Sequence, residues 1–161
     1  MDSLLGKILK TVTKVLDLIG GAALTFMMLL TVTDVLMRAF GHPLIGTFEV
    51  VAMSLALVIG FTIPKVSFDR GHVRVDMVIE RVSPKTRRIM NIFTRLICLG
   101  LFLIISYNLF GVANELRTAG EVSPTIQLPS YPFAYGVAVC CCIECLVFVQ
   151  DIIKIGKGEY E

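Results

Sequence analysis

The chain of 161 residues is 55% hydrophobic and carries 15 Lys and Arg against 13 Asp and Glu. This composition is too apolar for a soluble domain with an ordinary core. The net charge of +2 gives no reason to expect nucleic-acid binding, because membrane topology and anionic lipid headgroups account for the basic residues. We therefore expect an all-α membrane protein, since helices satisfy their own backbone polar groups in lipid.

Four long apolar segments define the expected architecture. Each is close to the ~20 residues that cross a hydrocarbon core of about 30 Å. We expect one domain over residues 1–161 with transmembrane helices at about 15–39, 47–66, 87–112 and 128–153.

The connecting segments differ sharply in positive charge. Twelve of the fifteen basic residues lie in the N-terminal tail, the middle connection or the C-terminal tail, while the first and third connections hold only Arg38 and Arg117. The excess of Lys and Arg marks the cytoplasmic side of a membrane protein. The sequence therefore predicts that both termini and the middle connection are cytoplasmic.

The first connection is flanked by three charged residues. Asp34 and Arg38 are four residues apart and share one face of the first helix, and Glu49 follows the short turn. We expect these three side chains to form a structural lock for the first helical hairpin. A proton- or ion-coupling site is the alternative, which the neutralising Arg38 makes less favourable.

The middle connection contains an amphipathic pattern at about 73–82. Val75, Val78, Ile79 and Val82 follow the i, i+3, i+4, i+7 spacing of one helical face. This pattern is typical of a short interfacial helix that lies on the membrane or on a partner. The alternative is a solvated basic loop that serves only topology.

Two ionisable residues lie inside the expected spans. Arg95 is about eight residues into the third helix, and Glu144 is about eight residues from the end of the fourth. Each costs about 2.5–3.5 kcal/mol on insertion scales when it is central. Because consecutive antiparallel helices bring similar depths together, we predict an Arg95–Glu144 ion pair. Snorkelling of Arg95, or pairing of either residue with a partner protein, is the alternative.

The remaining reactive side chains indicate no cofactor or metal. All five cysteines lie within expected spans, so the CxxC spacing of Cys142 and Cys145 has an apolar setting that disfavours thiolates. The two histidines, His42 and His72, lie in different connections. We expect the cysteines to serve as packing residues.

Three motifs together resemble a known family. They read DVLMRAFGHPL at 34–44, followed by Glu49; RGHVRVD at 70–76; and SPTIQLPSY at 123–131. On these motifs, from about residue 15 to 155, the chain is similar to the small, DctQ-like membrane subunit of tripartite ATP-independent periplasmic (TRAP) transporters. Ile45 and Phe48 depart from the residues common in the family, and Tyr131 stands where a Trp is common.

The resemblance implies a non-catalytic subunit in the bacterial inner membrane. A periplasmic binding protein would deliver an organic acid to a large membrane subunit, which moves it by a sodium-coupled elevator motion. The small subunit would scaffold that large subunit and help to dock the binding protein. The resemblance implies loop or partner contacts for Arg70, Gly71, His72, Arg74 and Asp76, and contacts near the binding protein for Ser123, Pro129 and Tyr131.

Two other classes of function stay open from the residues alone. An autonomous small homo-oligomeric transporter would need an intramembrane carboxylate, for which Glu144 is the candidate. A membrane anchor of a haem- or quinone-linked oxidoreductase would place pairs of histidines within spans, whereas His42 and His72 lie in loops.

Overall fold

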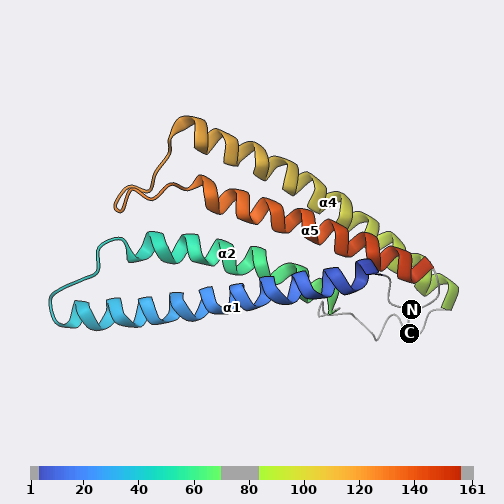
Figure 1. Ribbon diagram of the computed structural model, residues 1–161, viewed down its shortest axis with the longest axis horizontal. Helices are drawn as coiled ribbons and strands as arrows, with labels where there is room; N and C mark the ends of the chain where they lie inside the picture. Colours follow the sequence, from blue (N-terminus) through green and yellow to red (C-terminus); the bar gives the residue numbers. More distant parts are fainter. Residues whose placement is uncertain (1–3, 70–83, 157–161) are drawn as a thin grey trace.

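A computed structural model describes residues 4–69 and 84–156 of the protein. Within these residues, four helices make up the regular structure. Figure 1 shows them. The described residues contain no β-strand beyond an isolated bridge between Val122 and Pro129. The prediction of an all-helical protein with four membrane-length helices is confirmed. The helices are α1 (Leu4–Ala39), α2 (Thr47–Phe68), α4 (Pro84–Ala119) and α5 (Tyr131–Gly156).

The two outer helices are longer than their expected spans. Helices α1 and α4 each contain 36 residues, or about 54 Å at 1.5 Å per residue, against a hydrocarbon core of about 30 Å. Their charged first turns therefore continue the apolar helices without a break. The amphipathic segment expected at about 73–82 lies outside the described residues.

The helices form a layer in the order α1, α2, α5, α4 (Figure 1). Close contacts join α1 to α2, α2 to α5, and α5 to α4. Half of the apolar window of α5 is buried within the chain, against 6% for α1 and 11% for α4. Helix α5 is therefore the centre of the packing, and α1 and α4 are its edges.

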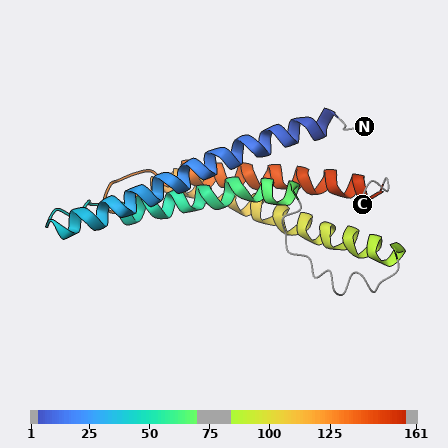
Figure 2. The same cartoon turned by 90° about the horizontal axis from the view of Figure 1, so that it is seen from below.

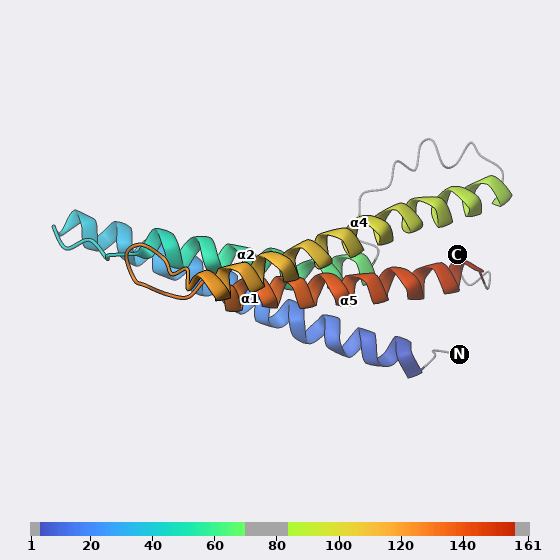
Figure 3. The same cartoon turned by 90° about the horizontal axis from the view of Figure 1, so that it is seen from above.

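The helices spread apart in different directions at the two ends of the layer (Figures 1 and 2). We call the end that carries the α1–α2 turn (40–46) and the α4–α5 loop (120–130) the hairpin end, and the opposite end the terminal end. At the terminal end, the views from below and from above show the first turns of α1 and α4 on opposite sides of α5 (Figures 2 and 3).

Glycines allow the central helices to approach closely. A Cβ atom at Gly60 would lie 3.2 Å from both methyl groups of Val137, across the α2–α5 contact. A Cβ atom at Gly20 would lie 2.8 Å from Thr62 Oγ1, across the α1–α2 contact. In lipid there is no hydrophobic driving force between helices, so helices associate through close van der Waals packing. Small residues make this packing possible.

The parallel register of α2 and α5 places the end of α2 well inside the length of α5. Gly60 faces Val137, and Ser67 contacts Glu144; each pair is separated by 77 residues. Phe68, the last residue of α2, is therefore level with Cys145. Helix α5 continues 11 residues further to Gly156, which is about 16 Å.

The antiparallel register of α4 and α5 decides which side chains meet near the terminal end. The hydroxyl of Ser106 donates to the Ala138 carbonyl, 3.2 Å away. Arg95 lies 11 residues earlier on α4, so it is level with a position about 11 to 13 residues after Ala138 on α5. That position is Asp151 and not Glu144.

Candidate functional site

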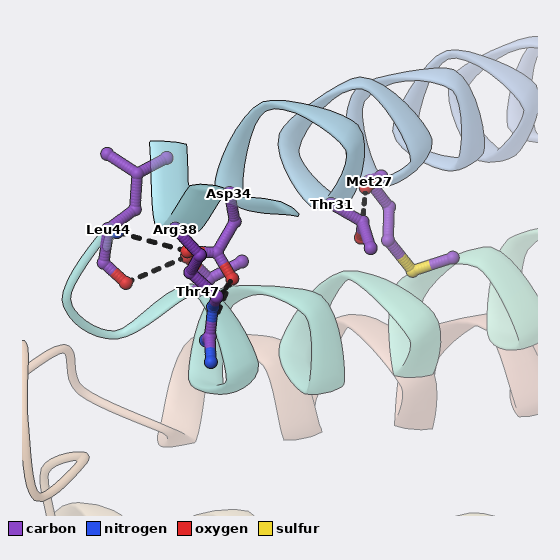
Figure 4. A network of polar contacts seen from close by, with 6 residues as sticks. All are labelled: Met27, Thr31, Asp34, Arg38, Leu44 and Thr47. Carbon is purple, nitrogen blue, oxygen red and sulfur yellow. Dashed lines mark hydrogen bonds and ion pairs between the residues drawn. The ribbon is translucent and has the colours of Figure 1, made fainter. Parts of the chain in front are cut away.

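The α1–α2 turn is held by Asp34, a buried residue in the last part of α1. Its carboxylate accepts a hydrogen bond from Arg38 Nε at 2.9 Å and another from the backbone N–H of Leu44 at 3.0 Å. The Thr47 hydroxyl donates to the Leu44 carbonyl at 3.1 Å, so the turn is tied at both ends (Figure 4). One carboxylate therefore joins the helix to the turn that follows it.

Glu49 faces the α4–α5 loop instead of Arg38. The Ser123 hydroxyl donates to Glu49 Oε2 at 2.6 Å, and the backbone N–H groups of Thr125 and Ile126 donate to the two carboxylate oxygens at 2.9 and 3.1 Å. Glu49 lies in the first turn of α2, where the helix dipole favours an anion. The structure thus divides the expected three-residue lock into two anchors, Asp34–Arg38 within α1 and Glu49 between the two hairpins.

The α4–α5 loop is shaped to present these donors. The backbone N–H of Ser123 donates to Leu128 O at 2.9 Å, and that of Gln127 donates to Ser123 O at 3.1 Å. Gln127 has a left-handed φ of 56°, which is uncommon for a residue other than glycine. The loop therefore folds back on itself and directs two consecutive N–H groups at one carboxylate.

The three loop residues singled out from the sequence occupy different parts of this structure. Ser123 is buried and donates to Glu49. Pro129 pairs with Val122 in the isolated bridge, and Tyr131 begins α5. Only Ser123 of the three takes part in the anchor.

A second contact between the hairpins depends on Gly46. Its φ is +83°, and a Cβ atom there would lie 2.6 Å from Ile126 Cγ1. The left-handed conformation and the close side chain both exclude a larger residue.

Gly46→Ala is expected to lower the free energy of unfolding by about 2–5 kcal/mol, from left-handed strain and overpacking together. Gly41→Ala is the matched control, because Gly41 has a φ of +80° with no atom within 4 Å of the added Cβ. The control should lose only about 1–2 kcal/mol, as measured by denaturation in detergent micelles. Adding Ile126→Ala to Gly46→Ala should recover part of the excess loss, and equal losses for the two glycine variants would contradict the Ile126 contact.

Near the terminal end, Arg95 forms an ion pair with Asp151 at 3.2 Å between α4 and α5. The exposed fractions of the two side chains are 12% and 8%. The Arg95 guanidinium carbon also lies 5.8 Å from the centroid of the Phe148 ring, within range of a cation–π interaction. Asp151 was not identified from the sequence, although it lies seven residues after Glu144 on the same helical face.

Glu144, the partner predicted for Arg95, accepts a hydrogen bond from the Ser67 hydroxyl. This contact joins the last turn of α2 to α5. Among the residues that the structure describes, the second carboxylate oxygen of Glu144 has no hydrogen-bond partner. The carboxylate is close enough to Arg95 and Asp151 to interact electrostatically with both. Arg95, Glu144 and Asp151 therefore belong to one buried polar cluster, with Asp151 as the ion-pair partner.

The residues expected to contact a partner from the middle connection lie outside the described residues. These are Arg70, Gly71, His72, Arg74 and Asp76. Their assignment stays a prediction.

Two membrane-length hairpins, joined by Glu49 at one end and by the Ser67–Glu144 hydrogen bond towards the other, define a small multi-pass integral membrane protein. The family of tripartite ATP-independent periplasmic transporters, DctQ component, matches residues 27–157, so the chain belongs to this family. No curated protein and no solved structure matches the chain.

Family membership assigns the general setting of the protein. The chain is the small membrane component of a TRAP transporter, a multi-pass protein of the inner membrane. Its family works with a large membrane subunit and a substrate-binding protein. The resemblance found from the three sequence motifs is thereby confirmed.

Proposed function

We propose that the chain is a non-catalytic scaffold for the large, elevator-type membrane subunit of a sodium-coupled TRAP transporter for organic acids. The observation that carries this proposal is the family match over residues 27–157. Three well-anchored helix contacts, α1–α2, α2–α5 and α5–α4, are consistent with a static scaffold. Both termini are cytoplasmic in this proposal.

The orientation follows from the distribution of charge over the structure. Lys7, Lys10 and Lys14 lie on the first turns of α1, and Arg87 and Arg88 lie on the first turns of α4, all towards the terminal end. The basic residues near the hairpin end are Arg38 and Arg117. The positive-inside rule therefore supports a cytoplasmic terminal end and a periplasmic hairpin end.

The hairpin end is also the proposed docking surface for the substrate-binding protein. Glu49 ties the α4–α5 loop to the start of α2, and Asp34 ties the α1–α2 turn to α1. Loops that are ordered before binding lose less conformational entropy when a partner docks. Two connected and anchored loops therefore support a preformed platform.

The proposed function is tested by capture of the tagged chain from its native membranes in mild detergent. We expect a large polytopic subunit of the same transporter to be retained in stoichiometric amount. Proteoliposomes that contain both subunits and the binding protein should take up an organic acid under a sodium gradient. Omission of this chain should abolish uptake. Recovery of the chain alone as a homo-oligomer, or full uptake without it, would contradict the proposal.

A further inference from the structure

The outward face of α4 is a surface that the chain itself leaves uncovered. Helix α4 is an edge of the layer (Figure 1) and contacts α5 with its opposite side, where Ser106 is buried. At intervals of three or four residues, the outward side carries one row of side chains that share a helical face. We call this row the α4 outer face; it consists of Gly100, Ile104, Tyr107, Asn108 and Gly111.

The middle of the α4 outer face lies in an uncharged part of α4 that is long enough to cross the hydrocarbon core. The charged residues that bracket this part of α4 are Arg95 and Glu115, with 19 residues between them, or about 28 Å of helix. Tyr107 is 12 residues, about 18 Å, from Arg95 and 8 residues, about 12 Å, from Glu115. Tyr107 and Asn108 therefore lie inside this uncharged stretch, in the half nearer to Glu115.

These two side chains have more hydrogen-bonding capacity than α4 can satisfy. Asn108 Nδ2 donates to the Ile104 carbonyl at 2.8 Å, which uses one of the four hydrogen-bonding positions of the amide. Tyr107 is 81% exposed, and within the described residues its hydroxyl makes no hydrogen bond. Lipid tails offer neither donors nor acceptors, so polar side chains at this depth favour a protein partner.

At the opposite edge of the layer, exposed polar side chains in the middle of α1 use their hydrogen-bond donors within the helix. In the middle of α1, between Asp17 and Asp34, the exposed polar side chains are threonines. The hydroxyls of Thr25, Thr31 and Thr33 each donate to the backbone carbonyl four residues earlier, at 2.8 to 2.9 Å. These hydroxyls are satisfied within α1, so its outer face is compatible with lipid.

Two glycines next to the polar pair make the α4 outer face suitable for a closely packed helix. Apart from its own stretch of helix, a Cβ atom at Gly100 or at Gly111 would meet no atom of the described residues within 4 Å. Small residues with polar neighbours are typical of helix–helix interfaces in membranes, because they let backbones approach and let side chains hydrogen-bond across. The steric and the hydrogen-bonding observations are independent of each other.

We propose that the α4 outer face is the surface on which a transmembrane helix of the large membrane subunit packs. Tyr107 and Asn108 donate or accept hydrogen bonds across this interface, and Gly100 and Gly111 set its close spacing. The occupant is the large subunit because the family works with that intramembrane partner. This inference therefore rests on the proposed function and adds the location of the interface.

The test uses a matched set of glycine substitutions in the full chain, co-expressed with the large subunit of the same transporter. Gly100→Leu and Gly111→Leu should each reduce the large subunit retained on the tagged chain by about tenfold, because the added side chains separate the helices. Gly21→Leu on α1 is the control, since a Cβ atom there also meets no atom within 4 Å. It should leave retention unchanged, and all three variants should elute as monodisperse proteins.

A photo-crosslinker gives a readout that does not depend on a disruptive substitution. Benzoyl-phenylalanine in place of Tyr107 should form an adduct with the large subunit, whereas the same group in place of Leu29, 57% exposed on α1, should not. An adduct with a second copy of this chain, or loss of retention in Gly21→Leu alone, would overturn the inference. If the wild-type chain, Gly100→Leu and Gly111→Leu all retained the large subunit equally, the inference would be overturned and the proposed function would stand. Failure of the wild-type chain to retain a large subunit would instead refute the proposed function.

Discussion

Arg95→Ala is expected to cost about 3–5 kcal/mol of stability, because it removes the cation that pairs with the buried Asp151 carboxylate. The pair is separated by 3.2 Å, and both side chains are largely buried. The lost contact of Arg95 with the Phe148 ring adds to this effect. The free energy of unfolding in detergent micelles measures the loss, and Asp151→Ala should cost a similar amount.

A double-mutant cycle identifies the carboxylate that Arg95 stabilises. Removing both members of the Arg95–Asp151 pair should be less costly than the sum of the single substitutions, since neither member is left buried without the other. The same cycle with Glu144→Ala should give a smaller coupling energy, because Glu144 hydrogen-bonds to Ser67. A larger coupling to Glu144 than to Asp151 would contradict the pairing in the structure and favour the pair predicted from the sequence.

Glu49→Gln is expected to release the α4–α5 loop from the start of α2. The amide keeps the size of the side chain but offers a single acceptor oxygen, and its NH₂ group would face backbone N–H donors. The carboxylate accepts from Ser123, Thr125 and Ile126. Hydrogen exchange of the Thr125 and Ile126 amides should accelerate by about tenfold, and docking of the substrate-binding protein should weaken.

The matched control for this prediction lies in the same loop. Glu121 is exposed, and its backbone carbonyl accepts from the Ser130 N–H. Glu121→Gln should therefore leave the exchange of Thr125 and Ile126 unchanged. Equal acceleration in both variants would show that a general change of loop charge, and not the Glu49 anchor, controls the order of the loop.

The hairpin end shows which part of a site can be predicted from sequence. Asp34 and Arg38 are four residues apart on α1, so helical geometry alone brings them together, and the 2.9 Å contact follows. Glu49 was placed with them because it is near in sequence. Its hydrogen-bond partners lie 74 to 77 residues away, where no local periodicity relates them to α2.

The buried cluster near the terminal end shows the same division. Depth along each span predicted that ionisable residues of the third and fourth helices would meet. The predicted partner of Arg95, Glu144, nevertheless lies two helical turns from Asp151, the residue that pairs with Arg95 in the structure. Apolar residues fill both helices on all sides, so hydropathy contains almost no information on register. The hydrogen bond from Ser106 to the Ala138 carbonyl marks the register that the packed helices adopt.

The sequence by itself determined the helical class, the number of spans and the membership of the TRAP family. These properties depend on segment length, mean hydropathy and short motifs, each of which is contained within one stretch of chain. The tertiary structure alone decided the order α1, α2, α5, α4, the Glu49 anchor between the hairpins and the Arg95–Asp151 pair. These features depend on steric fit between helices far apart in sequence, because close packing selects one register among many of equal hydrophobicity.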